Sequence, residues 1–292
     1  MLLVTVICTP SYAAESAACL DLERAFSPKA ELSSIEINAR LFRAAGLGCI
    51  RFARTLLAAG ASVEARDRLG AMPLAHAARA GHLELVRLLL AQGAPIDARE
   101  LNGTTALYAA AENDRLSVVR ELLEKGADAN LPGRSGVTPL AAAAYRDNDT
   151  MLALLLARGA DPKIADKTGK TPIMYAAALG FAPIVRRLLE AGVPVDARDG
   201  NELTALMWAA GHADNAGSAD ALATVALLIE RSAAIDAADN RGRTAVMIAA
   251  ERGHAAIAAL LLARGAKADL RDKDGKTARD LAANDEVREK LP

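Results

Sequence analysis

The chain has few aromatic residues, few cysteines and almost no net charge. Aromatic side chains make up 3% of the 292 residues, three cysteines are present, and 35 Lys and Arg nearly balance 36 Asp and Glu. A core with so few aromatic rings must be built from aliphatic and small side chains, and a hydrophobic content of 52% is enough for one. A near-neutral chain also lacks the basic surface of nucleic-acid-binding proteins. We therefore expect no nucleic-acid partner.

Sequence patterns for catalysis and cofactor binding are missing as well. The chain contains no G-x-S-x-G, H-E-x-x-H, P-loop or C-x-x-C pattern, and Gly46-Leu-Gly48 lacks the third glycine of a dinucleotide fingerprint. Acidic pairs such as Asp272 and Asp274 fall in turn-forming sequence, where Asp is common. Without any set of residues that suggests a reaction, we predict that the protein is not an enzyme and uses no cofactor or metal.

The chain does contain a regular repeat. A Gly-Ala or Gly-Val pair returns every 33 residues, and after a longer gap Ser232 and Gly265 continue the same spacing, the earlier glycines being Gly60, Gly93, Gly126, Gly159 and Gly192. A fixed period of this length is typical of stacked supersecondary units. Units begin near residues 39, 67, 100, 133, 166, 199, 239 and 272, with a degenerate first unit and a partial last one.

Each unit has the signals of two short helices. A threonine precedes an alanine-rich run, where its hydroxyl can cap the first helix, and Pro73, Pro139 and Pro172 stand at the first helical position. A leucine-rich stretch with helical spacing follows. The Gly then ends the second helix, because a left-handed C′ position suits glycine best. Ser232 breaks this rule, so we expect either strain or a different backbone at that turn.

These residues resemble the ankyrin repeat, whose hallmark is D-x-x-G-x-T-P-L-H-x-A-A-x-x-G-H. The segment from Asp166 to Gly180 and the segment from Asp239 to His254 carry it most clearly, and the resemblance extends over residues ~67–280. It implies an all-α solenoid of about eight units, each with two helices and a β-hairpin loop. It further implies a monomer that binds another protein through the concave face, with His82 and His254 bonding neighbouring loops.

The N-terminal segment resembles a secretory signal. Leu2 to Cys8 is apolar and Ser11-Tyr12-Ala13 offers a cleavage site, although no Lys or Arg precedes Arg24. We predict a cleaved signal over 1–13, a capping extension over 14–38, and a periplasmic or secreted protein of a bacterium without membrane insertion; without a signal the protein would be cytoplasmic. In an oxidising compartment Cys19 and Cys49 are expected to form a disulfide, the alternative being two buried thiols.

Aromatic residues mark a candidate binding face. Tyr108, Tyr145, Tyr175 and Trp208 fall in the first helices of four successive units. They are either anchors for a partner or fillers of an alanine-rich core, and Tyr145 stands where the family usually exposes a side chain. By their positions at loop tips and first-helix ends, the further partner-binding candidates are Leu69, Arg79, Asn102, Glu112, Asn113, Arg146, Lys170, Leu179, Arg243 and Arg252.

One unit is longer than the others. Thr204 and Thr244 are 40 residues apart, seven more than the period, and the insertion covers residues 211–220. His212 in this stretch is a partner-binding candidate, whereas a metal site there has no supporting ligand spacing. The chain is thus predicted to be an exported interaction scaffold. The alternatives are a stabilising or assembly partner of a periplasmic enzyme of oxidative defence, and a secreted effector directed at a host.

Overall fold

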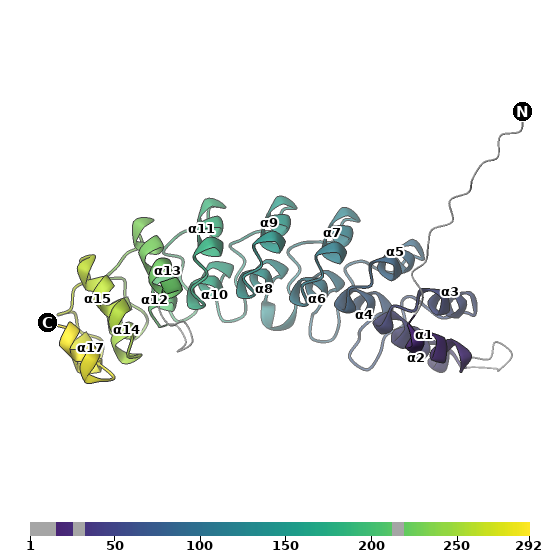
Figure 1. The fold of residues 1–292 in the computed structure, drawn as a ribbon, viewed down its shortest axis with the longest axis horizontal. Coiled ribbons are helices and arrows are strands. Elements are labelled where there is room, and N and C mark those ends of the chain that lie inside the picture. Colours follow the sequence, from purple (N-terminus) through teal and green to yellow (C-terminus); the bar gives the residue numbers. More distant parts are fainter. Residues whose placement is uncertain (1–15, 26–32, 212–218) are drawn as a thin grey trace, which may run out of the picture.

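Paired helices stacked side by side form an elongated arch in the computed structural model of the chain (Figure 1). The structure describes residues 16–25, 33–211 and 219–292, so the signal predicted over 1–13 lies outside the described residues. Within these ranges the secondary structure is helical and contains no strand. This confirms the expected all-α solenoid and corrects one detail, because the loop of each unit is hairpin-shaped without being a β-hairpin.

Each unit places its first helix and loop on the inner, concave edge of the arch, which is the lower edge in Figure 1. The first helices are α2 (Ser34–Leu47), α4 (Pro73–Ala80), α6 (Ala106–Glu112), α8 (Pro139–Tyr145), α10 (Pro172–Ala178), α12 (Ala205–Ala210), α14 (Ala245–Glu251) and α16 (Ala278–Leu281). The second helices are α3 (Ile50–Ala58), α5 (Leu83–Ala91), α7 (Leu116–Glu124), α9 (Asp149–Ala157), α11 (Ala182–Glu190), α13 (Ala219–Glu230), α15 (Ala255–Ala263) and α17 (Asp285–Lys290).

The helix ends follow the expected chemistry. The side chains of Thr105, Thr138 and Thr204 accept hydrogen bonds from backbone N–H groups in the first turns of α6, α8 and α12. The repeated glycine adopts a left-handed backbone, with φ of 86° at Gly192. Ser232 adopts the same left-handed conformation with φ of 66°. The turn is therefore strained, and its backbone does not differ from that of the other units. The repeat therefore fixes the backbone even where glycine is missing.

An aspartate at the start of five of the loops holds the loop in shape, whereas the loops at Glu100 and Gly133 begin with other residues. Oδ1 of Asp166 accepts hydrogen bonds from the N–H groups of Thr168 and Lys170. The same carboxylate oxygen bonds the residues two and four positions ahead at Asp67, Asp199, Asp239 and Asp272. Successive loops are then joined by single backbone bonds, such as Gly200 N–H to Thr168 O at 2.9 Å. The loops thus form one continuous edge along the arch.

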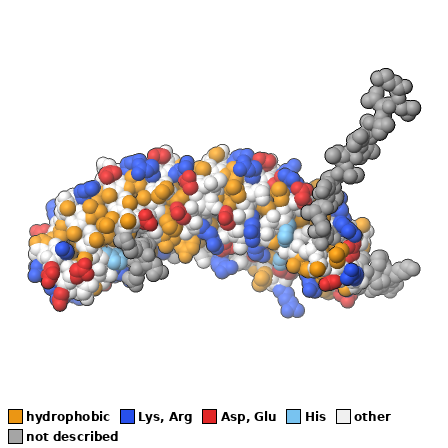
Figure 2. Space-filling model, in the orientation of Figure 1, with side chains coloured by type: hydrophobic (Ala, Val, Ile, Leu, Met, Phe, Trp, Pro, Cys, Tyr) orange, Lys and Arg blue, Asp and Glu red, His pale blue; other side chains and the backbone are white. Residues whose placement is uncertain are grey.

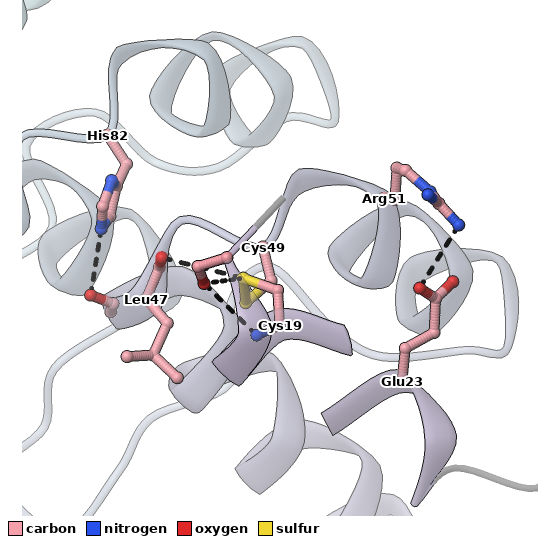
Figure 3. Close-up of a disulfide and its surroundings, with 8 residues drawn as sticks. Cys19, Glu23, Leu47, Cys49, Arg51 and His82 are labelled. Carbon is pink, nitrogen blue, oxygen red and sulfur yellow. Dashed lines mark hydrogen bonds and ion pairs between the residues drawn. A yellow bond between two sulfur atoms is a disulfide. The ribbon is translucent and has the colours of Figure 1, made fainter. Parts of the chain in front are cut away.

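The N-terminal end of the stack is closed by α1 (Ala17–Arg24), which packs on α2 and α3. The sulfur atoms of Cys19 and Cys49 lie 2.06 Å apart, at disulfide distance, and both residues are buried (Figure 3). Arg51 of α3 and Glu23 of α1 form an ion pair at 3.4 Å beside them. The N-terminal helix is therefore fastened to the first unit from two sides.

The first unit begins earlier than expected. A capping box of Ser33 and Glu36 starts α2 at Ser34, so the predicted division at residue 39 between an extension and the repeats falls inside a helix. Ile35, at the start of α2, is 79% exposed.

The lengthened unit adds residues to a helix as well as to a turn. Helix α13 has 12 residues where α11 and α15 have 9, and its end keeps the same spacing to Ser232 as α11 has to Gly192. The extra turn is therefore at the N-terminal end of α13. It packs close to the end of α10, where a Cβ at Gly180 would lie 3.2 Å from the backbone N of Ala221. The rest of the insertion, over 212–218, is outside the described residues.

Candidate functional site

Three aromatic rings and a lysine lie together on the concave face, and we call Tyr145, Tyr175, Trp208 and Lys170 the aromatic groove. The rings of Tyr145 and Tyr175 meet edge to face with centroids 6.1 Å apart. The Nζ of Lys170 lies 4.1 Å from the Trp208 ring centroid and 5.8 Å from that of Tyr175. Because aromatic and cationic side chains dominate binding hot spots, this cluster is the strongest candidate for partner contact.

Tyr145 is the exposed member of the groove. It ends α8, and 55% of its surface is accessible. The equivalent positions, 12 residues after the start of a unit, hold Arg79, Glu112, Ala178, Gly211 and Glu251, which are charged or small. A large exposed ring at a position where these units have a charged or small residue fits a contact role better than a core role. Of the two interpretations that the sequence left open, exposure favours binding at this residue.

Tyr175 and Trp208 are half-buried and anchored. The phenol of Tyr175 donates to Oδ2 of Asp166 at 2.5 Å, and the indole N–H of Trp208 donates to Oδ2 of Asp199 at 3.0 Å. Each of these two rings thereby links its helix to the loop of the same unit. Each ring also has one face toward the groove. These two residues combine the structural role and the surface role that the sequence left as alternatives.

Tyr108 differs from the other three aromatic residues. It is 4% exposed, and its ring packs against Gly133, where an added Cβ would lie 2.4 Å from the ring. Its phenol donates to Glu112 at 3.4 Å, and burial first, then the Glu112 carboxylate, raises the pKa of Tyr108 to about 12. The expectation of a four-residue stripe is therefore corrected to three rings, with Tyr108 beneath the surface.

Two hollows flank Lys170 on this face. The first, of about 220 Å³, is lined by Val137, Ala141 and Ala142 together with Tyr108, Tyr145 and Tyr175. The second, of about 340 Å³, is lined by Leu203, Met207, Trp208, Gly211 and Ile248. Arg146 and Glu112 border the first hollow, whereas Arg241, Glu251 and Arg252 border the second. In the space-filling view the lower edge of the arch is hollowed and carries hydrophobic and basic side chains side by side (Figure 2).

Other candidates fall into two groups. Leu69, Asn102, Arg146 and Arg252 are exposed at loop tips or first-helix ends, where they can reach a partner. Arg79 and Arg243 are engaged within the protein, because Arg79 pairs with Glu100 at 2.5 Å and Arg243 pairs with Glu251 at 2.5 Å. The Arg243 side chain is only 11% exposed, so the prediction of a contact there finds little surface to support it.

Two further candidates are partly buried, and a third is not described. Asn113 donates from Nδ2 to the Ala109 carbonyl of its own helix at 2.8 Å, and Leu179 follows the end of α10. For both residues, which lie at the C-terminal ends of first helices, contact with a partner remains a prediction. His212 lies outside the described residues.

The histidines of the described residues have structural partners. A ring nitrogen of His82 lies 3.1 Å from the Gly46 carbonyl and one of His254 lies 2.9 Å from the Ala210 carbonyl, which confirms the loop-bonding role implied by the repeat. His76, for which the sequence offered no partner, bonds Oδ2 of Asp67 at 2.9 Å. In the described ranges no three His, Cys, Asp or Glu side chains converge as metal ligands would. None of the described helices has the length and apolarity to span a bilayer.

The family models agree with this architecture. The chain matches the family described as Ankyrin repeats (3 copies) over residues 41–133 and 140–223, and the one described as Ankyrin repeats (many copies) over residues 228–282. The chain belongs to the ankyrin-repeat family. Ankyrin repeats are generally protein–protein interaction modules, so protein binding is the general role that the family implies for this ankyrin stack. A comparison with curated proteins gave no match.

Sequence reasoning missed part of the site. Val137, Met207 and Ile248 line the two hollows of the ankyrin stack, yet none was a candidate. Ile248 stands nine residues after Asp239, the spacing that also joins Tyr175 to Asp166 and Trp208 to Asp199. This common position in the period is the signal that would have placed Ile248 on the same face.

Proposed function

We propose that the protein is an exported bacterial scaffold that binds a partner protein through the aromatic groove and takes no part in catalysis. The observation that carries this proposal is the exposed ring of Tyr145 beside Tyr175 and a hollow with mainly apolar lining. Exposed apolar surface of this kind, with polar groups around it, marks interaction sites on soluble proteins.

Affinity capture from periplasmic extract of the source cells tests the binding role. The mature chain and its Tyr145→Ala variant are compared, with Ile35→Ala as a matched control that also shortens an exposed hydrophobic side chain. We expect Tyr145→Ala to leave the melting temperature within about 2 °C, because an exposed side chain contributes little to the core, and to reduce the yield of a stoichiometric partner at least tenfold. Equal capture by all three proteins would remove the groove as the binding site.

The export part of the proposal is supported by the apolar run from Leu2 to Cys8, the small residues before Ala14, and the paired Cys19 and Cys49. Fractionation of cells that produce the full chain tests it. The mature N-terminus should be found in the periplasm or medium, after Ala13 or Ala14. An uncleaved chain confined to the cytoplasm would overturn this part and leave the binding role standing.

A further inference from the structure

Three cations on the rim of the groove have no acidic partner among the described residues. The side chains of Arg146, Lys170 and Arg252 form no ion pair within these ranges, although Arg146 and Arg252 border the two hollows and Lys170 lies between them. The neighbouring arginines are neutralised, since Arg241 pairs with Asp239 at 3.2 Å and Arg243 with Glu251. Positive charge is therefore left over at three points along the groove.

Negative charge inside the groove is small by comparison. Glu112 is the acidic residue lining the first hollow, and it already accepts the phenol hydrogen of Tyr108. Glu251 lines the second hollow and is paired with Arg243. Among the side chains that line the two hollows, together with Lys170, three cations without an ion pair face one unpaired carboxylate, that of Glu112, although the whole chain carries a formal charge of −1. The carboxylates of Asp166 and Asp199 accept hydrogen bonds from the groove rings themselves. A partner that fits must bring acidic groups to these cations.

The apolar lining sets a second requirement. The first hollow is lined mainly by apolar side chains, among them Ala141, Ala142 and tyrosine rings. The second is more polar, but Met207, Trp208 and Ile248 give it an apolar part. A side chain such as Leu or Phe would bury apolar surface there, which favours binding. A partner segment with charged side chains only would leave these hollows unfilled. The segment that fits therefore needs an apolar side chain at each end.

From these features we infer that the groove binds a linear acidic segment of another protein, with one apolar anchor in each hollow and Asp or Glu residues between them. This inference rests on the proposed function and specifies the chemistry of its partner. The first hollow lies at α8 and the second between α12 and α14, two to three units along the stack, and helices that pack in contact are separated by roughly 8–10 Å. The anchors are thus roughly 16–30 Å apart, which an extended chain spans in about five to nine residues.

Lys170 lies between the two hollows. Its Nζ is held against the Trp208 and Tyr175 rings, and the stacked contact leaves the ammonium available on its other side. A carboxylate placed midway along the bound segment can pair with Lys170, and carboxylates near the two ends can pair with Arg146 and Arg252. The order apolar, acidic, apolar in the partner then mirrors the order hollow, lysine, hollow in the protein.

The test uses fluorescein-labelled seven-residue peptides and fluorescence polarisation with the mature chain. One peptide has Leu at both ends and alternating Asp and Glu between them. Comparison peptides replace the acids by Ser, replace them by Lys, or replace both Leu by Ser. We expect the acidic, Leu-anchored peptide to bind at least tenfold tighter than each of the others, with an affinity that falls as salt rises.

Charge-neutralising variants locate the binding. The double variant Lys170→Gln/Arg252→Gln should weaken the acidic peptide at least tenfold, whereas Lys125→Gln/Arg264→Gln, which removes two exposed charges at the ends of second helices, should leave it unchanged. Circular dichroism confirms that both fold. Equal affinity for the acidic and Ser peptides, tighter binding of the Lys peptide, or binding to anionic vesicles in place of the peptides would each overturn the inference. If Tyr145-dependent capture of a partner persists in that case, the proposed function stands and only its acidic specificity fails.

Discussion

The phenol of Tyr175 donates a hydrogen bond of 2.5 Å to the carboxylate of Asp166, nine residues earlier in the chain. His76 with Asp67 and Trp208 with Asp199 repeat this bond at the same separation. The carboxylate therefore has two tasks in these units, because Oδ1 folds the loop and Oδ2 receives the ring of the first helix. Helix and loop move as one body, which keeps the rings of the groove in place.

Removing the Tyr175 hydroxyl should lower stability. Tyr175→Phe keeps the ring but leaves Oδ2 of Asp166 without its donor, and we expect a loss of about 1 kcal/mol in the free energy of unfolding. Tyr145→Phe is the matched control, since the Tyr145 hydroxyl has no hydrogen-bond partner among the residues that the structure describes. Urea denaturation followed by circular dichroism measures both. A loss of the same size in the control would mean that the bond to Asp166 contributes nothing.

Acid should weaken the same contact. Burial opposes ionisation of Asp166, but hydrogen bonds from Tyr175, Thr168 and Lys170 outweigh it and hold its pKa below the ordinary value of 3.8. Since the folded pKa is the lower one, the stabilisation is complete above the unfolded pKa and is lost as the pH falls through the folded value. Wild type should therefore lose more stability than Asp166→Asn between about pH 5 and pH 3. Parallel urea midpoints across this range in the two proteins would contradict the assignment to Asp166.

Ser232 offers a stabilising substitution. Its φ of 66° places it in the left-handed region, which costs a residue with a Cβ about 1 kcal/mol relative to glycine. Ser232→Gly should raise the free energy of unfolding by that amount. Gly192→Ala, at the equivalent turn with φ of 86°, should lower it similarly, because the space around Gly192 is open and only the backbone conformation opposes a side chain. Thermal denaturation measures the two opposite shifts, and a neutral result for both would show that the turn tolerates a Cβ.

Gly133 should resist substitution for a different reason. Its φ of −92° lies outside the left-handed region, and a Cβ would lie 2.4 Å from the buried ring of Tyr108. Gly133→Ala should destabilise by about 1–3 kcal/mol through overpacking. In a Tyr108→Ala background the same substitution should cost little, since the ring is gone. A double-mutant cycle by urea denaturation measures this coupling, and additive effects would rule out the contact as the cause.

The paired cysteines should be oxidised in the exported protein and should stabilise its N-terminal end. Cys19 and Cys49 are 30 residues apart, for which the chain-entropy model gives about 3–4 kcal/mol. A double Cys19→Ser/Cys49→Ser variant should melt at a lower temperature than the oxidised wild type, and a reductant should lower only the wild-type value. Thiol titration in denaturant checks the pairing directly. Two free thiols in the unreduced protein would leave both cysteines as buried thiols.

The sequence by itself determined the unit of this protein. The 33-residue period, the Thr and Pro at helix starts and the Gly at helix ends are local signals, so they could be read without knowing any contact. They gave the ankyrin stack and the unusual turn at Ser232. The position of Tyr145 within the period also placed it on the concave face.

Only the tertiary structure decided which of the aromatic rings faces a partner. Tyr108 and Tyr145 both belong to first helices, but Tyr108 fills the space left by Gly133 of the next unit while Tyr145 has no such neighbour above it. Likewise, Nζ of Lys170 lies over the Trp208 ring of the following unit, and Arg243 pairs with Asp272 of the following unit at 3.5 Å. These outcomes depend on side chains that meet across units, and a pattern read along one unit does not contain the identity of its neighbour.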